Sequence, residues 1–172
     1  MRNKNADSIS LIDKLEYDSL QDVLKGLLTP ENDKVISELV TLLLNGDTDE
    51  YLLDDTVYQM LTDRRSKKSV EFALNYVKKF LSFSDKILLM AVIDGLEHNV
   101  DYDIDKAISE TTEVKLHPDL KDMGEYAFKL FREERISNFL LESFIDFDKL
   151  GEFLERQDKA VSTIHGVLEI GG

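Results

Sequence analysis

Apolar residues recur three and four positions apart along most of the chain, which is the spacing that places them on one face of a helix. One clear example runs through positions 35, 36, 39, 40, 42 and 43. This spacing predicts helices over residues 8–28, 31–45, 49–62, 67–82, 85–98, 103–114, 118–133, 136–145 and 147–157. No segment requires a strand. We expect the tail 159–172 to be flexible, because its propensities are mixed and it ends in two glycines.

Proline and glycine mark the expected helix ends. Thr29 before Pro30 predicts an N-cap followed by proline at the first helical position, where its missing amide costs nothing. Asn45 and Gly46 predict the end of that helix, with glycine in the left-handed conformation. The pair His117–Pro118 predicts a second helix start of the same kind.

Similar helices recur at a regular interval. Val35, Val70 and Ile104 begin three of them, at spacings of 35 and 34 residues, and each is followed four residues later by Leu or Ile. A period near 35 with two helices per unit is typical of an α-solenoid, in which each unit buries its apolar face against the next. We therefore expect one all-α domain over 1–172, with an N-terminal cap (1–30), three helix-pair repeats (31–133) and a C-terminal cap (134–158). The apolar layer of the last cap is Phe139, Leu140, Phe144, Phe147, Leu150, Phe153 and Leu154.

The segments SDKILLMAVIDGL (84–96) and HPDLKDMGEYAFKLF (117–131) begin with acidic or Pro-Asp residues and carry Ala91 and Ala127 in mid-helix. In these features the chain resembles the HEAT-like helical repeats over about residues 31–133. The first unit departs from the pattern, since Asp55 stands where a small residue is expected. The resemblance implies that the second helix of each pair lines a concave surface. An irregular helical bundle is the alternative architecture.

Charge narrows the choice of partners. The chain has 172 residues, and its 21 Lys and Arg against 35 Asp and Glu give a net charge of −14. Such a charge repels nucleic acid and anionic membranes and favours a basic protein partner. Without a long apolar run or a secretory signal, we expect a cytoplasmic protein that does not bind membranes.

Few residues offer catalytic chemistry. There is no cysteine, which excludes disulfides, thiolate nucleophiles and Cys-ligated zinc, and no glycine-rich phosphate loop. His98, His117 and His165 are scattered, and only Asp94 and His98 lie one helical turn apart as an acid–base pair requires. An exposed surface pair is the favoured explanation. We therefore expect neither an enzyme nor a bound metal or cofactor.

Two charged motifs also have simple explanations. Asn99, Asp101, Asp103 and Glu110 follow the spacing of a calcium loop, but Ile104 occupies the place where the sharp turn needs glycine. A cap for the helix that begins near Ile104 is the better interpretation. The basic cluster RRSKK (64–68) falls between helix pairs, where a solvated loop is expected.

Acidic residues gather on the expected second helices and predict the partner-binding surface. We select six: Asp54, Asp55, Asp94, Glu97, Asp122 and Glu125. A merely solvated acidic face would explain the same residues. The functional hypothesis is a protein-binding module, such as an inhibitor or toxin-immunity protein that neutralises a basic partner. The alternative is a scaffold or regulatory subunit that self-associates through its aromatic C-terminal layer.

Overall fold

The computed structural model describes residues 4–46, 50–64, 67–96, 102–133 and 145–171. The chain forms two compact units, an N-terminal unit (Met1–Ser84) and a C-terminal unit (Asp85–Gly172). The described residues contain nine helices and three strands, so the prediction of a mainly helical protein is confirmed. None of the described helices is both long and apolar enough to cross a bilayer.

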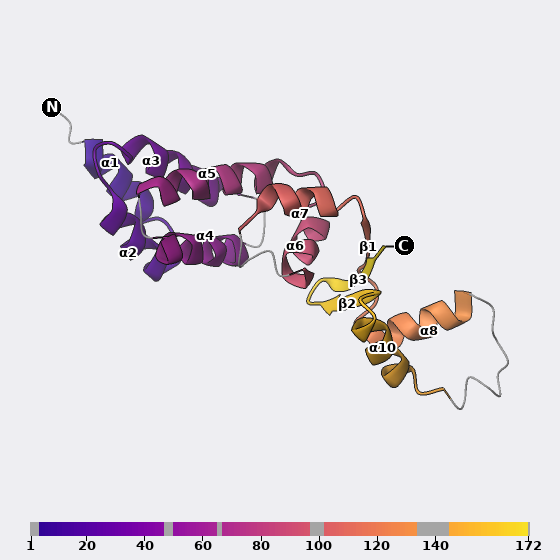
Figure 1. The fold of residues 1–172 in the computed structure, drawn as a ribbon. Helices are drawn as coiled ribbons and strands as arrows, with labels where there is room; N and C mark the ends of the chain where they lie inside the picture. Colours follow the sequence, from indigo (N-terminus) through magenta and orange to yellow (C-terminus); the bar gives the residue numbers. More distant parts are fainter. Residues whose placement is uncertain (1–3, 47–49, 65–66, 97–101, 134–144, 172) are drawn as a thin grey trace. The chain divides into compact units, whose positions relative to one another are not determined.

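The N-terminal unit consists of helices packed on one another. They are α1 (Lys4–Ile12), α2 (Asp18–Leu27), α3 (Asp33–Asn45), α4 (Glu50–Arg64) and α5 (Lys67–Ser82). Figure 1 shows α3 beside α5, and α3 also packs against α1, while α4 contacts α2 and α5. Each helix contributes fully buried apolar residues to the core, among them Ile12, Leu20, Leu24, Ile36, Leu39, Val57, Met60 and Val70. Ile36 and Leu39 belong to the apolar spacing that predicted the helix over 31–45.

The helix predicted over 8–28 is interrupted at residues 13–17, so that two helices replace one. The Gln21 side-chain amide donates to the backbone carbonyl of Leu15, and the Lys25 ammonium lies 2.5 Å from the Asp13 carboxylate. Leu15 is buried within the turn. Apolar residues continue through the turn at helical spacing, which is why the sequence pattern did not reveal the break.

The start of α3 also differs from the prediction. The residue that precedes the helix is Asn32, which is 5% exposed, and not Thr29. Its side-chain oxygen accepts from the Thr29 amide at 2.7 Å and its amide group donates to the Leu27 carbonyl at 2.7 Å. Asn32 therefore closes the turn that contains Pro30. At the far end, Gly46 has an extended backbone (φ −66°, ψ 128°), so the predicted left-handed conformation is wrong.

The C-terminal unit combines helices with a sheet, and the expectation that no strand occurs is therefore wrong. Its elements are α6 (Lys86–Gly95), α7 (Ile104–Glu110), β1 (Val114–His117), α8 (Met123–Glu133), α10 (Phe147–Arg156), β2 (Ala160–Thr163) and β3 (Gly166–Ile170). The strand order is β1-β3-β2 and both pairings are antiparallel. Hence residues 160–170, expected to be a flexible tail, are two strands of a sheet.

Helices cover both faces of this sheet. On one face, Gly95 at the end of α6 lies against Val161, Thr163 and Leu168. On the other, Met123 and Tyr126 of α8 form a buried cluster with Ala160 and Val167. Because side chains alternate along a strand, neighbouring strand residues serve opposite faces. The sheet is thus an internal layer, which explains why Val167 and Leu168 are both fully buried.

The hairpin between β2 and β3 depends on Gly166. Its φ of +126° is a backbone conformation that residues with a Cβ rarely adopt, and a Cβ built there would lie 2.5 Å from the His117 carbonyl oxygen. The β-branched Val161, Thr163 and Val167 flank this turn and favour strands over a frayed end. His117 ends β1 and does not start a helix, so that prediction is wrong as well.

An aspartate directly precedes each described helix of this unit. Asp85, Asp103, Asp122 and Asp146 each accept a hydrogen bond, at 2.9–3.1 Å, from the backbone amide three residues further on. A carboxylate in this position satisfies an amide that has no partner within the helix, and it lies at the positive end of the helix dipole. The cap interpretation of Asp103 is confirmed; Asn99 and Asp101 lie outside the described residues.

The predicted repeats do not follow the observed elements closely. The boundary between the units falls inside the stretch 31–133, and α7 ends at Glu110 before the chain enters a strand. A regular solenoid and a single domain with the predicted caps stay predictions. The helix expected over 136–145 lies almost wholly outside the described residues.

Two glycines allow α8 and α10 to approach closely. A Cβ at Gly151 would lie 2.4 Å from the Met123 carbonyl oxygen, and one at Gly124 would lie 2.3 Å from an Asp148 carboxylate oxygen. Farther along the antiparallel pair, the Phe147 ring packs edge-on against Phe128 at 5.0 Å. The backbones touch at one end of the contact, and aromatic rings fill the space at the other.

We predict that Gly151→Ala lowers the free energy of unfolding by about 1–3 kcal/mol, because its new methyl group meets backbone that cannot move aside cheaply. Gly26→Ala is the matched control, since nothing lies within 4 Å of its Cβ position in α2. There the better helix propensity of alanine should leave stability unchanged or raise it by up to about 1 kcal/mol. Urea unfolding followed by circular dichroism measures both. Equal effects in the two variants would contradict the proposed close contact.

Candidate functional site

A cavity of about 280 Å³ opens in the N-terminal unit. The turn between α1 and α2 supplies residues 14–17, α3 supplies Leu43 and Leu44, and α4 supplies Asp54. Leu15, which is buried, anchors the turn, and Glu16 beside it is exposed. The break after α1 therefore does more than connect two helices, since it brings a carboxylate to the mouth of the cavity.

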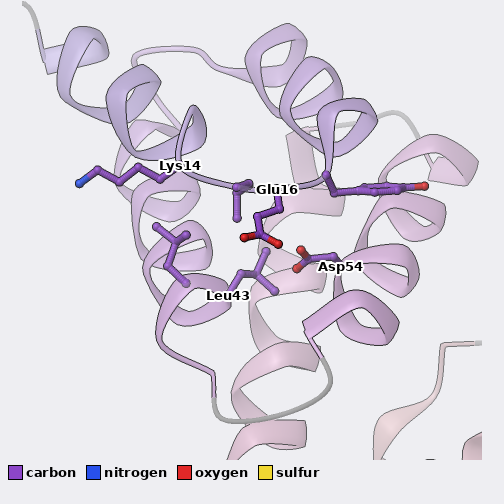
Figure 2. A pocket seen from close by; sticks show the side chains of 7 residues that line it. Lys14, Glu16, Leu43 and Asp54 are labelled. Carbon is purple, nitrogen blue, oxygen red and sulfur yellow. The ribbon is translucent and has the colours of Figure 1, made fainter.

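Two carboxylates face each other in this cavity. Figure 2 shows the side chains of Glu16 and Asp54 pointing toward one another, while the Lys14 ammonium points away from both. Asp54 is only 8% exposed. Three leucines, Leu15, Leu43 and Leu44, form apolar walls around the acidic groups. The arrangement suits a ligand with a positive end and an apolar stem.

The next residue of α4, Asp55, holds the neighbouring turn. Its carboxylate accepts from the Tyr17 hydroxyl at 3.4 Å and from the Gln59 side-chain amide at 3.0 Å. The Tyr17 ring in turn packs edge-on against Tyr58 at 5.5 Å. Of the two α4 residues selected from the sequence, Asp54 thus lines the cavity and Asp55 positions a tyrosine that borders it.

Two other selected residues, Asp122 and Glu125, form a reciprocal cap at the start of α8. The Asp122 carboxylate accepts from the Glu125 amide at 2.9 Å, and the Glu125 carboxylate accepts from the Lys121 amide at 2.8 Å. Both side chains are exposed. Their orientation is therefore fixed although they face solvent, as in a capping box.

The Asp148 carboxylate of α10 also lies at the start of α8. This carboxylate and that of Asp122 both border the position of the missing Gly124 Cβ, at 2.3 and 3.2 Å respectively. Exposed Asp119 lies on the turn just before α8. We call these four residues, Asp119, Asp122, Glu125 and Asp148, the acidic edge of the C-terminal unit.

The remaining sequence-selected sites are less defined. Asp94 is exposed near the end of α6, while Glu97 and His98 lie outside the described residues, so the Asp94–His98 pair has no described geometry. The basic cluster 64–68 spans the end of α4 and the start of α5, with Arg65 and Ser66 outside the described residues. Among the residues that the structure describes, no group of three or more His, Asp or Glu side chains could hold a metal ion.

The aromatic C-terminal layer is partly visible. Phe147 contacts Phe128 and Phe131, with the second ring centre at 5.6 Å, and Phe153 on the same helix is 55% exposed. Phe139, Leu140 and Phe144 lie outside the described residues. A large apolar side chain thus remains at the surface of α10.

A polar network around the buried His117 was missed by the sequence patterns. The Lys129 ammonium, which can only donate, lies 3.1 Å from Nδ1, and Nε2 lies 2.9 Å from the Glu169 carboxylate. Nδ1 therefore accepts from Lys129, and Nε2 donates to Glu169. His117 is 5% exposed, and both of its nitrogens are occupied. The ring therefore ties β1 to β3 and α8 and offers no free nitrogen to a substrate.

Tyr126 completes this network. Burial, followed by the charge of Glu169 and a hydrogen bond to it, raises the pKa of the Tyr126 hydroxyl from 10.0 to about 12, and Glu133 adds to the effect. The ring also packs against His117 at 5.6 Å. Only the pairing of β1 with β3 brings these groups together, because His117 and Glu169 are 52 residues apart.

We predict that one tyrosine ionises with a pKa near 12 and that this component disappears in Tyr126→Phe. Because the folded pKa lies above the unfolded value, the associated stability is complete below pH 10 and is lost as the pH rises toward 12. Glu169→Gln should lower the Tyr126 pKa only in part, since burial remains. Tyrosinate absorbance during a pH titration measures each shift. An unchanged titration in Tyr126→Phe would contradict the assignment.

The chain was compared with protein-family models, curated proteins and solved structures, and no match was found in any of the three. The cavity, the acidic edge and the charge of each unit are therefore the features of this chain that bear on its function.

Proposed function

We propose that the protein binds a basic protein and that the acidic edge of the C-terminal unit is part of the contact surface. The observation that carries this proposal is the uneven distribution of charge. The C-terminal unit has 20 Asp and Glu against 10 Lys and Arg, a net charge of −10, whereas the N-terminal unit has 15 against 11, a net charge of −4.

The competing explanation is that the acidic residues are only solvated and keep the protein dispersed. Small domains remain dispersed with a net charge of about 2 to 8 in magnitude, and the C-terminal unit exceeds that range. Helix capping accounts for four of its acidic residues, Asp85, Asp103, Asp122 and Asp146, but all four are still exposed. The excess charge costs self-repulsion, which a basic partner would relieve.

Preorganisation supports the same proposal. Because Asp122 and Glu125 are held by backbone amides, they lose little freedom when a partner binds. The field of a strongly acidic unit would also steer a basic partner and speed its association. Nucleic acid and anionic membranes would be repelled by the same field.

Within this class, we propose an inhibitor or toxin-immunity protein that neutralises its basic partner. The HEAT-like resemblance, with an acidic concave face on the second helices, belongs to the same proposal. Asp54, Asp55, Asp94 and Glu97 remain proposed partner-binding residues together with Asp122 and Glu125. No catalytic role is proposed, and cytoplasmic localisation is part of this proposal.

We predict that affinity for the basic partner falls as ionic strength rises from low to physiological values. The partner would be isolated by affinity capture, purified and measured by surface plasmon resonance. The double variant Asp119→Asn/Asp148→Asn should bind about threefold to tenfold more weakly, mostly through slower association. Asp22→Asn/Glu71→Gln, two exposed carboxylates of the N-terminal unit, is the control with the same charge change. Salt-independent binding, or equal losses in both variants, would exclude a contact at the acidic edge.

A self-associating scaffold is the second candidate, and the exposed Phe153 on α10 favours it. Light scattering would then give an oligomer that Phe153→Ala dissociates. Lys149→Ala, on an exposed position of the same helix, is the control. A monomer in dilute solution would remove the support for this candidate.

A further inference from the structure

We propose that the cavity between Glu16 and Asp54 receives one arginine side chain of a basic protein. This inference rests on the proposed function, and it adds a site in the other unit of the chain with a defined chemical preference. It identifies a pocket for a single residue, in contrast to the broad electrostatic surface of the acidic edge.

The charge of the cavity selects a cation. Glu16 and Asp54 approach it from different elements, the α1–α2 turn and α4, and their carboxylates point toward each other (Figure 2). The one lysine at the cavity, Lys14, directs its ammonium away from them. A cation between the two carboxylates would be attracted by both.

The walls select a cation with an apolar stem. Leu15, Leu43 and Leu44 line the cavity, and two of them, Leu15 and Leu43, are only 4% exposed. Desolvating a small metal ion against such walls is costly, and hard cations need more oxygen ligands than two carboxylates supply. A side chain whose methylene groups cover the leucines while its charged end meets the carboxylates fits both features.

Shape favours arginine over lysine. The planar guanidinium presents five donors in a fork, so it can bind two carboxylates on opposite sides at once. A lysine ammonium is a point charge that is more strongly hydrated. The volume of about 280 Å³ is near the lower limit of small-molecule sites, which suits one side chain better than a whole cofactor.

The position of the cavity also makes it reachable. Glu16 is exposed at its mouth, whereas Asp54 is 8% exposed at its base. Tyr17, which borders the opening, is held by its hydrogen bond to Asp55 and by its contact with Tyr58. Tyr17 is therefore held in place at the opening before a ligand enters, which lowers the ordering cost of binding on that side.

The test titrates the full chain with N-acetyl-arginine methylamide and follows backbone amides by NMR. We expect millimolar binding, with shifts that gather at Leu15, Glu16, Tyr17 and Leu44. The citrulline analogue has nearly the same shape without the charge and should not bind. Glu16→Gln should weaken binding about fivefold to tenfold, since one charge-assisted contact is lost. Asp22→Asn, an exposed carboxylate on α2, is the matched control and should leave binding unchanged.

A second variant separates shape from charge. Leu44→Phe enlarges a wall residue without changing any charge, and it should reduce binding by filling the cavity. The lysine analogue should bind several-fold more weakly than arginine. Equal shifts with citrulline would overturn the inference, as would shifts spread evenly over exposed acidic residues or a Glu16→Gln variant that binds like the wild type.

The two proposals fail in different ways. If the arginine analogue does not bind but a basic protein still binds in a salt-dependent manner, the cavity inference is wrong and the proposed function stands. If the cavity binds arginine but no basic protein binds the chain, the proposed function fails instead. Glu16→Gln should also weaken binding of the purified partner, and an unchanged affinity there would exclude the cavity from the contact.

Discussion

The density of carboxylates is the constraint on which the C-terminal unit depends. This unit has 20 acidic residues in 88 positions. Repulsion between carboxylates that folding brings close together destabilises the compact state. The observed solution is to place aspartates at helix starts. Asp85, Asp103, Asp122 and Asp146 bind backbone amides there, and the amide of Lys149 is the largest cause of the lowered Asp146 pKa. These four carboxylates therefore stabilise the helix starts, although additional negative charge would otherwise destabilise the unit.

The packing of this unit also depends on glycines, because a Cβ atom at three positions would crowd neighbouring atoms. Gly166 leaves room for the His117 carbonyl, Gly151 leaves room for the backbone of Met123, and Gly95 leaves room for the side chains of β2 and β3. These contacts join segments that are distant in sequence. They also position the edge strand β1, whose last residue is held between Lys129 and Glu169.

Acidic side chains have different surroundings in the two units. In the N-terminal unit, Asp54 is nearly buried beside leucines and faces Glu16, which is exposed at the mouth of the cavity. At the acidic edge, Asp122 and Glu125 face solvent with their orientation fixed by backbone amides. The first arrangement suits one organic cation, and the second suits long-range attraction of a basic surface. Net charge alone does not distinguish these two situations.

The sequence by itself determined the approximate position of most described helices, the acidic charge and the cap at Asp103, because each of these is a local property of neighbouring residues. It did not determine the break before Asp18, since the apolar spacing continues through the turn. Only the tertiary structure decided that residues 114–117 pair with 167–170, and that Glu16 faces Asp54. Such contacts depend on which distant segments bury one another, and a periodic pattern within one segment contains no information about its partner. The strands of the C-terminal unit illustrate this limit, because the helical spacing of residues 103–114 and 118–133 contains no sign that residues 114–117 pair with a strand near the end of the chain.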